Sequence, residues 1–178
     1  MSDLVKPLTG WRWPALAVVI SAAILAAAHG FERFGQLYPC PLCLRQREVY
    51  WALIAMVGVG LLLWRLRPAP RFIEGLNILV GLVFVTGAGV AAYHMGVEMG
   101  VFPSGCSAGS PAEAARRALE DPLAGLDEPQ ATGSCSEAAK VFGVSMATWN
   151  AGMSLGFAAI SFLVARETDK VSRQMAAL

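Results

Sequence analysis

Four long apolar segments are the feature that most restricts how this chain of 178 residues can fold. They cover residues 14–34, 46–64, 72–93 and 144–165. A helix needs ~20 apolar residues to cross the hydrocarbon of a bilayer, and each segment has about that length. Only 15% of the residues are charged, against ~25% in a soluble domain. We therefore predict an all-α integral membrane protein, a bundle of four transmembrane helices that forms a single domain over residues 1–178.

The first apolar segment allows a second interpretation. It follows a basic start with Lys6 and Arg12, and its apolar run of 15 residues, 14–28, ends in three alanines, a pattern also found in cleaved secretory signal peptides. Trp11 and Trp13 stand just before the segment, where aromatic residues anchor a helix at the membrane interface. We therefore expect the segment to be retained as the first span.

Small residues recur in the third and fourth apolar segments. Glycine would weaken a soluble helix, but in lipid it lets two helices approach closely. We therefore expect close helix contacts at these small residues. They are Gly75, Gly81, Gly87 and Gly89 in the third segment, and Gly152, Ser154 and Gly156 in the fourth.

Two polar connections lie on one side of the membrane, a short one at residues 35–45 and a long loop at residues 94–143. Within the long loop, Ser-Pro-Ala-Glu at residues 110–113 is typical of a capping box with proline at the first helical position. We expect a short helix from there to Glu120, lying on the membrane surface.

The distribution of basic residues predicts the orientation. Eight of the fourteen Lys and Arg residues lie in the amino terminus, the 65–71 turn and the carboxyl-terminal tail. Short segments rich in Lys and Arg face the cytoplasm, so both termini are expected inside and all four cysteines outside. In a bacterium the outer side of the inner (plasma) membrane is the oxidising periplasm. The net charge of +1 offers no basic patch for nucleic acid.

The stretch with the clearest chemistry is Tyr-Pro-Cys-Pro-Leu-Cys-Leu-Arg-Gln-Arg at residues 38–47. Two residues separate Cys40 from Cys43, and the prolines beside Cys40 stiffen the ring that the two sulfurs can close. The pattern predicts a helix from Cys43 onward, which places Arg47 one turn away on the same face. A guanidinium there favours a thiolate over a thiol, so we expect Cys43 to be the more reactive sulfur.

Cys106 and Cys135, 29 residues apart in the long loop, form a second candidate pair. Two pairs on one side of the membrane suggest a relay, because thiol–disulfide exchange passes electrons from pair to pair, with a lipid-soluble quinone as the terminal acceptor. A structural disulfide that closes the loop is an alternative, worth ~3–4 kcal/mol. Zinc is another, but it would need Cys106 and Cys135 as its third and fourth ligands, at a spacing unlike zinc motifs. We expect no metal.

These residues resemble the disulfide bond formation protein B family. Cys-Pro-Leu-Cys-Leu-Arg-Gln-Arg at residues 40–47 is similar to the CxLCxxQR pattern of that family. The resemblance continues in Tyr93-His94, in Gly96-Val97-Glu98, and in Phe-Gly-Val-Ser-Met-Ala-Thr-Trp-Asn at residues 142–150. It covers all four apolar segments and both cysteine pairs in the same order.

The resemblance implies a protein dithiol:quinone oxidoreductase that reoxidises a periplasmic thioredoxin-like dithiol oxidase, a DsbA-like protein, and passes the electrons to ubiquinone or menaquinone. It also implies the order of the relay. Cys106 would form the mixed disulfide with the partner, Cys135 would exchange with Cys40, and Cys43 would face the quinone.

The same resemblance implies four further site residues. Arg47 would hold the quinone, Met146 and Trp149 would line its pocket, and His94 would assist proton transfer. For Met146 and Trp149 the alternative is packing at the membrane interface, and for His94 it is a place at a helix end with no catalytic role.

Two other functions compete with this interpretation. A relative of vitamin K epoxide reductase also combines four helices with two cysteine pairs, but there the loop pair precedes the CxxC, whereas here the CxxC comes first. A non-enzymatic membrane scaffold with two structural disulfides would have cysteines that resist mild reductant and would bind no quinone.

Overall fold

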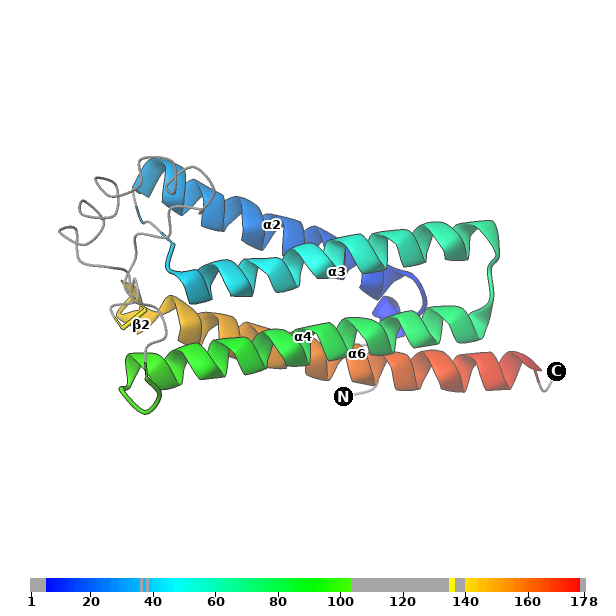
Figure 1. Cartoon of the computed structure of the whole chain (residues 1–178). Helices are drawn as coiled ribbons and strands as arrows, with labels where there is room; N and C mark the ends of the chain where they lie inside the picture. Colours follow the sequence, from blue (N-terminus) through cyan, green and yellow to red (C-terminus); the bar gives the residue numbers. More distant parts are fainter. Residues whose placement is uncertain (1–5, 36, 38, 104–134, 137–139, 177–178) are drawn as a thin grey trace.

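A computed structural model describes residues 6–35, 37, 39–103, 135–136 and 140–176 (Figure 1). Four long helices dominate this part of the chain: α2 (Arg12–Gly35), α3 (Pro41–Leu66), α4 (Pro70–Glu98) and α6 (Met146–Ala176). Each is long and apolar enough to cross a membrane, which confirms the prediction of an all-helical membrane bundle with four spans. The minor elements are the 3-10 turn η1 (Lys6–Leu8) and the strands β1 (Lys140–Val141) and β2 (Val144–Ser145).

Each observed helix extends beyond the apolar segment that predicted it. α3 begins at Pro41, because proline lacks the N–H that would be unpaired in a first turn. α4 continues to Glu98, so His94 belongs to a helix and not to the long loop as expected. α6 extends through the polar tail, where Lys170 pairs with Glu167 and Arg173 with Asp169 one turn away.

The described end of the long loop is a small hairpin, where we had expected irregular chain followed by a helix from Val144. β1 pairs antiparallel with β2, and Phe142 and Gly143 form the turn with φ angles of 54° and 79°. Two successive positive φ values are typical of the tight turns that match the twist of a hairpin. The Ser145 hydroxyl accepts a hydrogen bond from the Thr148 N–H at 3.1 Å and so caps the start of α6. The surface helix expected at residues 111–120 lies outside the described residues.

The helices pack around one apolar core, with α4 against α6, α3 against α4 and α2 against α3. Aromatic side chains from three helices meet at its centre, where the ring centroids of Phe84 and Phe157 are 5.2 Å apart and Tyr50 lies edge-on to Phe84. A Cβ at Gly81 would lie 2.9 Å from the Phe162 ring, so this glycine allows the close contact of α4 with α6.

The small residues of α6 do not behave as predicted. Cβ atoms built on Gly152 and Gly156 would meet no atom within 4 Å, and the same holds for Gly75 and Gly89 of α4, so the close approach expected at these four glycines is wrong. Ser154, between Gly152 and Gly156, is the residue that faces inward: it is buried and lies beside Gly87 of α4. The helical period places residue 154 on the opposite face from residues 152 and 156.

One end of the bundle gathers the elements that carry the chemistry. The carboxyl ends of α2 and α4, the amino ends of α3 and α6, and the hairpin all lie at the left in Figure 1. The α3–α4 turn and the carboxyl terminus lie at the other end. The first cysteine pair and the chain around Cys135 therefore meet at one end of the helices.

Candidate functional site

Three of the four cysteines share one small buried cluster at this end of the bundle. Cys40, Val97 and Cys135 are its buried members, and Leu42 and Cys43 pack against them partly buried. We call this group the cysteine cluster. Cys40 and Cys43 are free thiols, whereas Cys135 is disulfide-bonded. Cys106, the predicted partner of Cys135, lies outside the described residues.

Cys40 occupies the N-cap position of α3. Its Sγ accepts a hydrogen bond from the Cys43 N–H at 3.1 Å, so the first turn of the helix holds the two sulfurs together. The hydrogen bond between the two thiol side chains, followed by burial, holds the pKa of the Cys40 thiol well above its ordinary value. Cys40 therefore keeps its proton while Cys43, only half-buried, remains the accessible sulfur.

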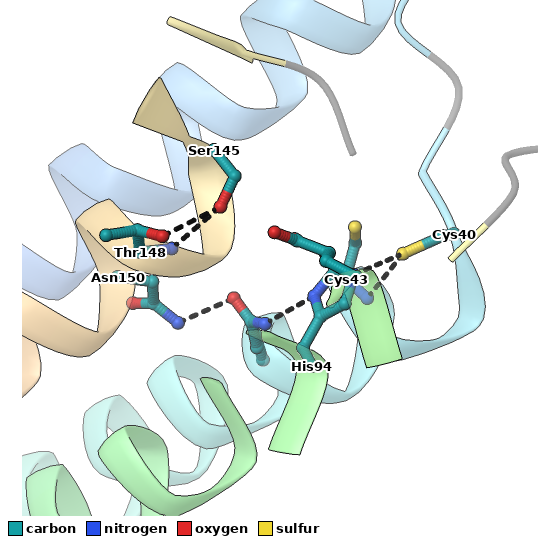
Figure 2. Close-up of polar contacts among 8 residues, drawn as sticks. Cys40, Cys43, His94, Ser145, Thr148 and Asn150 are labelled. Atoms are coloured by element: carbon teal, nitrogen blue, oxygen red, sulfur yellow. Dashed lines mark hydrogen bonds and ion pairs between the residues drawn. The ribbon is translucent and has the colours of Figure 1, made fainter. Parts of the chain in front are cut away.

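His94 stands directly beside this pair although it comes from α4. The ring is only 1% exposed, and its Nε2 lies 3.7 Å from the Cys40 Sγ and 3.6 Å from the Glu98 Oε1. That carboxylate oxygen is buried without a hydrogen-bond partner among the described residues. Figure 2 shows the imidazole facing Cys40 and Cys43. The structure therefore brings one predicted residue, His94, and one unexpected residue, Glu98, to the sulfurs.

A chain of hydrogen bonds continues from His94 into the bundle. The Gln46 Nε2 lies 2.9 Å from the His94 Nδ1, and the Asn150 Nδ2 donates to the Gln46 Oε1 at 2.7 Å (Figure 2). The Tyr50 hydroxyl donates in turn to the Asn150 Oδ1. We call His94, Gln46, Asn150 and Tyr50 the polar chain. Gln46, Asn150 and Tyr50 were not predicted as site residues, although polar side chains inside apolar spans are a signal of function.

Arg47 points away from the polar chain, toward α2. Its guanidinium pairs with the Glu32 carboxylate at 2.5 Å and donates to the Ala28 carbonyl at 3.3 Å. Helix α3 begins at Pro41, so Cys43 and Arg47 are one helical turn apart, as the sequence predicts. The pair fixes the carboxyl end of α2 against the start of α3.

Comparison with known protein families shows which family this chain belongs to. The family model described as "Disulfide bond formation protein DsbB" matches residues 11–164. The chain belongs to the DsbB family. Comparisons with curated proteins and with solved structures found no match. Membership makes this protein a multi-pass membrane oxidoreductase of disulfide bond formation, and the alternative of a vitamin K epoxide reductase relative is set aside.

The other two residues that the DsbB resemblance singled out lie at the start of α6. Met146 is the first residue of that helix and is half-buried. Trp149 is 47% exposed, and its indole N–H donates to the Val141 carbonyl of the hairpin at 3.2 Å. The indole therefore connects α6 to the hairpin, and a role of either residue toward a quinone stays a prediction.

Cys40, Cys43 and His94 are also candidate ligands for a metal ion. The side-chain donor atoms of Cys40, Cys43 and His94 all lie within 4.8 Å of one another, a set different from the Cys106 and Cys135 ligands considered from the sequence. A metal would need the lone pair of the His94 Nε2. Because the Gln46 amide N–H faces Nδ1, the neutral ring carries its proton on Nε2. The hydrogen bonds therefore suit a donor to sulfur better than a metal ligand.

Proposed function

We propose that this protein is a quinone-coupled thiol oxidase. It reoxidises a periplasmic thioredoxin-like dithiol oxidase of the DsbA type through two cysteine pairs and passes the electrons to ubiquinone or menaquinone. The observation that carries the proposal is the cysteine cluster, in which the disulfide-bonded Cys135 and the free thiol of Cys40 are buried together and the partly buried free thiol of Cys43 packs against them. Family membership supports the same activity.

Electrons and protons balance when the relay consists of two thiol–disulfide exchanges between the cysteine pairs and one oxidation of Cys40 and Cys43 by the quinone. The partner dithiol reduces the Cys106–Cys135 disulfide, and two electrons and two protons pass to these sulfurs. The Cys135 thiolate then attacks Cys40 of a Cys40–Cys43 disulfide, which breaks that bond and leaves the electron pair on Cys43. The Cys106 thiolate next attacks Cys135 of the Cys135–Cys40 mixed disulfide, which re-forms the Cys106–Cys135 bond and leaves the second electron pair on Cys40. The quinone then takes up the two electrons and two protons of the reduced Cys40 and Cys43.

The residues around the cysteine cluster fit a quinone as the electron-accepting substrate. A quinone takes two electrons and two protons, and its carbonyl oxygens require hydrogen-bond donors. Arg47 of α3 and His94 of α4 can supply donors near the CxxC, and Phe31 and Phe34 expose apolar rings near the carboxyl end of α2. Met146 and Trp149 are the residues of α6 that we propose to line the pocket.

We also propose that the cysteines face the periplasm of a bacterial inner membrane and that both termini are cytoplasmic. The support is the concentration of Lys and Arg in the amino terminus, the 65–71 turn and the tail. The turn and the carboxyl terminus share the end of the bundle opposite the CxxC (Figure 1). Lipid and the quinone are the partners within the membrane.

The test uses the full chain purified in detergent, with a ubiquinone analogue and a reduced thioredoxin-like dithiol. We expect the ultraviolet band of the oxidised quinone to disappear at a rate that depends on all four cysteines. Cys43→Ser and Cys135→Ser variants are the matched controls and should be inactive. If no dithiol reduces any quinone and the cysteines resist mild reductant, the protein is better explained as a non-enzymatic membrane scaffold with two structural disulfides.

A further inference from the structure

The polar chain is a costly feature for the interior of a membrane bundle. His94, Gln46, Tyr50 and Asn150 are all buried and come from three different helices, α4, α3 and α6. Polar groups in apolar surroundings are tolerated when they are hydrogen-bonded, and inside membranes they mark functional positions. Each of these side chains bonds the next, so the chain is connected from the cysteines to the core.

The bonds of the polar chain have one direction. The Tyr50 hydroxyl donates to the Asn150 Oδ1, which leaves the Asn150 amide N–H to donate to the Gln46 Oε1. The Gln46 Nε2 then presents an N–H to the His94 Nδ1. An N–H facing Nδ1 requires a lone pair on that nitrogen, because two donors cannot share one hydrogen bond. In this arrangement each amide presents its oxygen toward Tyr50 and its N–H toward His94.

The direction of the bonds decides what His94 can do at the sulfurs. In a neutral imidazole one nitrogen is protonated, so a lone pair on Nδ1 places the proton on Nε2. Nε2 faces the Cys40 Sγ at 3.7 Å and the Glu98 Oε1 at 3.6 Å. Both of these atoms can accept a hydrogen bond. The ring also hydrogen-bonds the Cys135 backbone. It can therefore donate toward the cysteine cluster, and it has no free lone pair with which to take a proton from Cys40.

We infer that Tyr50, Asn150 and Gln46 are positioning residues that hold His94 as the neutral Nε2–H tautomer, a hydrogen-bond donor toward the CxxC sulfurs. Amide groups do not conduct protons readily, and the chain ends at a tyrosine inside the bundle, so it sets an orientation and is not a proton path. The value of the tautomer for catalysis rests on the proposed function. When the second exchange leaves an electron pair on Cys40, the Nε2–H dipole stabilises the negative charge beside it.

The tautomer can be measured directly because the chain contains only two histidines. We would label histidine with nitrogen-15 in the full-length reduced protein and use His29→Gln to assign the resonances. The His94 Nδ1 should show the shift of an unprotonated nitrogen and Nε2 that of an N–H. A protonated Nδ1, either as the other tautomer or as a doubly protonated ring facing Glu98, would overturn the inference.

Three variants separate the polar chain from general packing. Gln46→Glu replaces the amide donor by a carboxylate acceptor, so the tautomer should reverse to Nδ1–H. Tyr50→Phe frees the Asn150 amide to turn and should give a mixture of tautomers. Tyr93→Phe is the matched control, because Tyr93 stacks on Phe102 and, in the described part of the chain, has no hydrogen bond to the four residues of the polar chain. If Tyr50→Phe leaves the wild-type pattern, or Tyr93→Phe changes it equally, the inference fails.

The rate of thiol–disulfide exchange, measured beside the spectrum, distinguishes a failure of the tautomer inference from a failure of the proposed quinone-coupled function. Tyr50→Phe should slow thiol–disulfide exchange roughly fivefold, the effect of one hydrogen bond of about 1 kcal/mol, and Tyr93→Phe should not. The spectrum is recorded on thiols without quinone, so it decides the tautomer even if no quinone is ever reduced. A wild-type protein with the inferred tautomer but no quinone reduction would contradict the proposed function alone. An unchanged exchange rate in a Tyr50→Phe protein with mixed tautomers would refute the positioning role.

Discussion

At the scale of single residues, Arg47 has two partners that limit what it can do. The guanidinium is partly buried, pairs with Glu32 and donates to the Ala28 carbonyl. With respect to the described residues, several N–H groups of the planar guanidinium fork remain for a substrate carbonyl. A charge in this position therefore both joins α2 to α3 and offers a donor one helical turn from Cys43.

Substitution of Arg47 should separate these two roles. We expect Arg47→Ala to slow quinone reduction roughly 10- to 100-fold, since hydrogen bonds to charged groups are worth about 1.5–3 kcal/mol. Arg47→Lys should be intermediate, because lysine keeps the charge and loses the planar fork. The rates are followed by quinone absorbance, with affinity for the soluble partner as the internal reference.

Glu32→Gln is the matched control for the Arg47 series. It removes the ion pair with α2 but leaves the guanidinium in place. If Glu32→Gln impairs quinone reduction as much as Arg47→Ala does, the ion pair and not the donor is what matters. Equal activity in wild type, Arg47→Ala and Arg47→Lys would remove Arg47 from the mechanism.

The two thiols of the CxxC should differ in how their reactivity depends on pH. The Cys43 side chain and burial raise the pKa of Cys40, so Cys40 stays a thiol at about pH 9, where an ordinary cysteine is largely ionised. The thiolate is the form that reacts. In the reduced protein, alkylation of Cys40 by iodoacetamide should therefore stay slow until the solution is more alkaline still.

The cause of the raised pKa can be tested with Cys43→Ser. This variant removes the largest cause, so the pH dependence of Cys40 alkylation should move toward lower pH. Peptide mass spectrometry gives the rates, and protein unfolded in detergent gives the ordinary behaviour. If alkylation of Cys40 depends on pH in the same way in the wild type and in Cys43→Ser, burial alone raises the pKa of Cys40.

The sequence reveals some of these residues and hides others for a physical reason. Cys40, Cys43 and Arg47 stand together in the chain, so one local pattern identifies them. The polar chain joins residues that are far apart: 48 positions separate Gln46 from His94, and 104 separate Gln46 from Asn150. Such contacts depend on how the helices are rotated about their axes, which hydrophobic periodicity alone does not define when a helix is apolar on all sides.

At the scale of elements, the position of each glycine on its helix decides whether it matters. Gly81 faces α6, where a Cβ would lie 2.9 Å from the Phe162 ring, whereas Gly89 faces open space. The sequence identifies glycine-rich segments but not which glycine faces a neighbour, as the error at Gly152 and Gly156 illustrates. The hairpin was missed for a related reason, since strands of two residues carry no periodicity.

This difference predicts opposite effects of one substitution at two sites. Gly81→Ala should lower the free energy of unfolding by about 1–3 kcal/mol, because the rigid ring of Phe162 must shift. Gly89→Ala should be neutral or stabilise by up to ~1 kcal/mol through helix propensity. Unfolding of both variants is measured in detergent by circular dichroism. Equal effects at the two sites would contradict the close contact of α4 with α6.

At the scale of the whole molecule, the bundle separates a chemical end from a basic end. The α3–α4 turn carries Arg65, Arg67 and Arg71, and it lies opposite the CxxC in Figure 1. All the described cysteines are at the chemical end. This polarity follows from the amino-acid sequence, because an even number of spans returns the chain to the side on which it began and the loops alternate between the two sides.

The relay across the chemical end predicts different defects for its two pairs. Cys106→Ser should abolish exchange with the soluble dithiol, because no loop disulfide remains for the partner to reduce. After chemical reduction, the Cys40–Cys43 pair should still be oxidised by a quinone. The hydrogen bonds that position this pair, from the Cys43 N–H to the Cys40 Sγ and between that sulfur and His94, do not involve Cys106. Thiol counting before and after addition of quinone measures the second reaction, and partner oxidation measures the first. If the Cys106→Ser protein oxidises the partner at the wild-type rate, electrons enter at the CxxC directly. The proposed order of the relay, from the loop pair to the CxxC, would then be wrong.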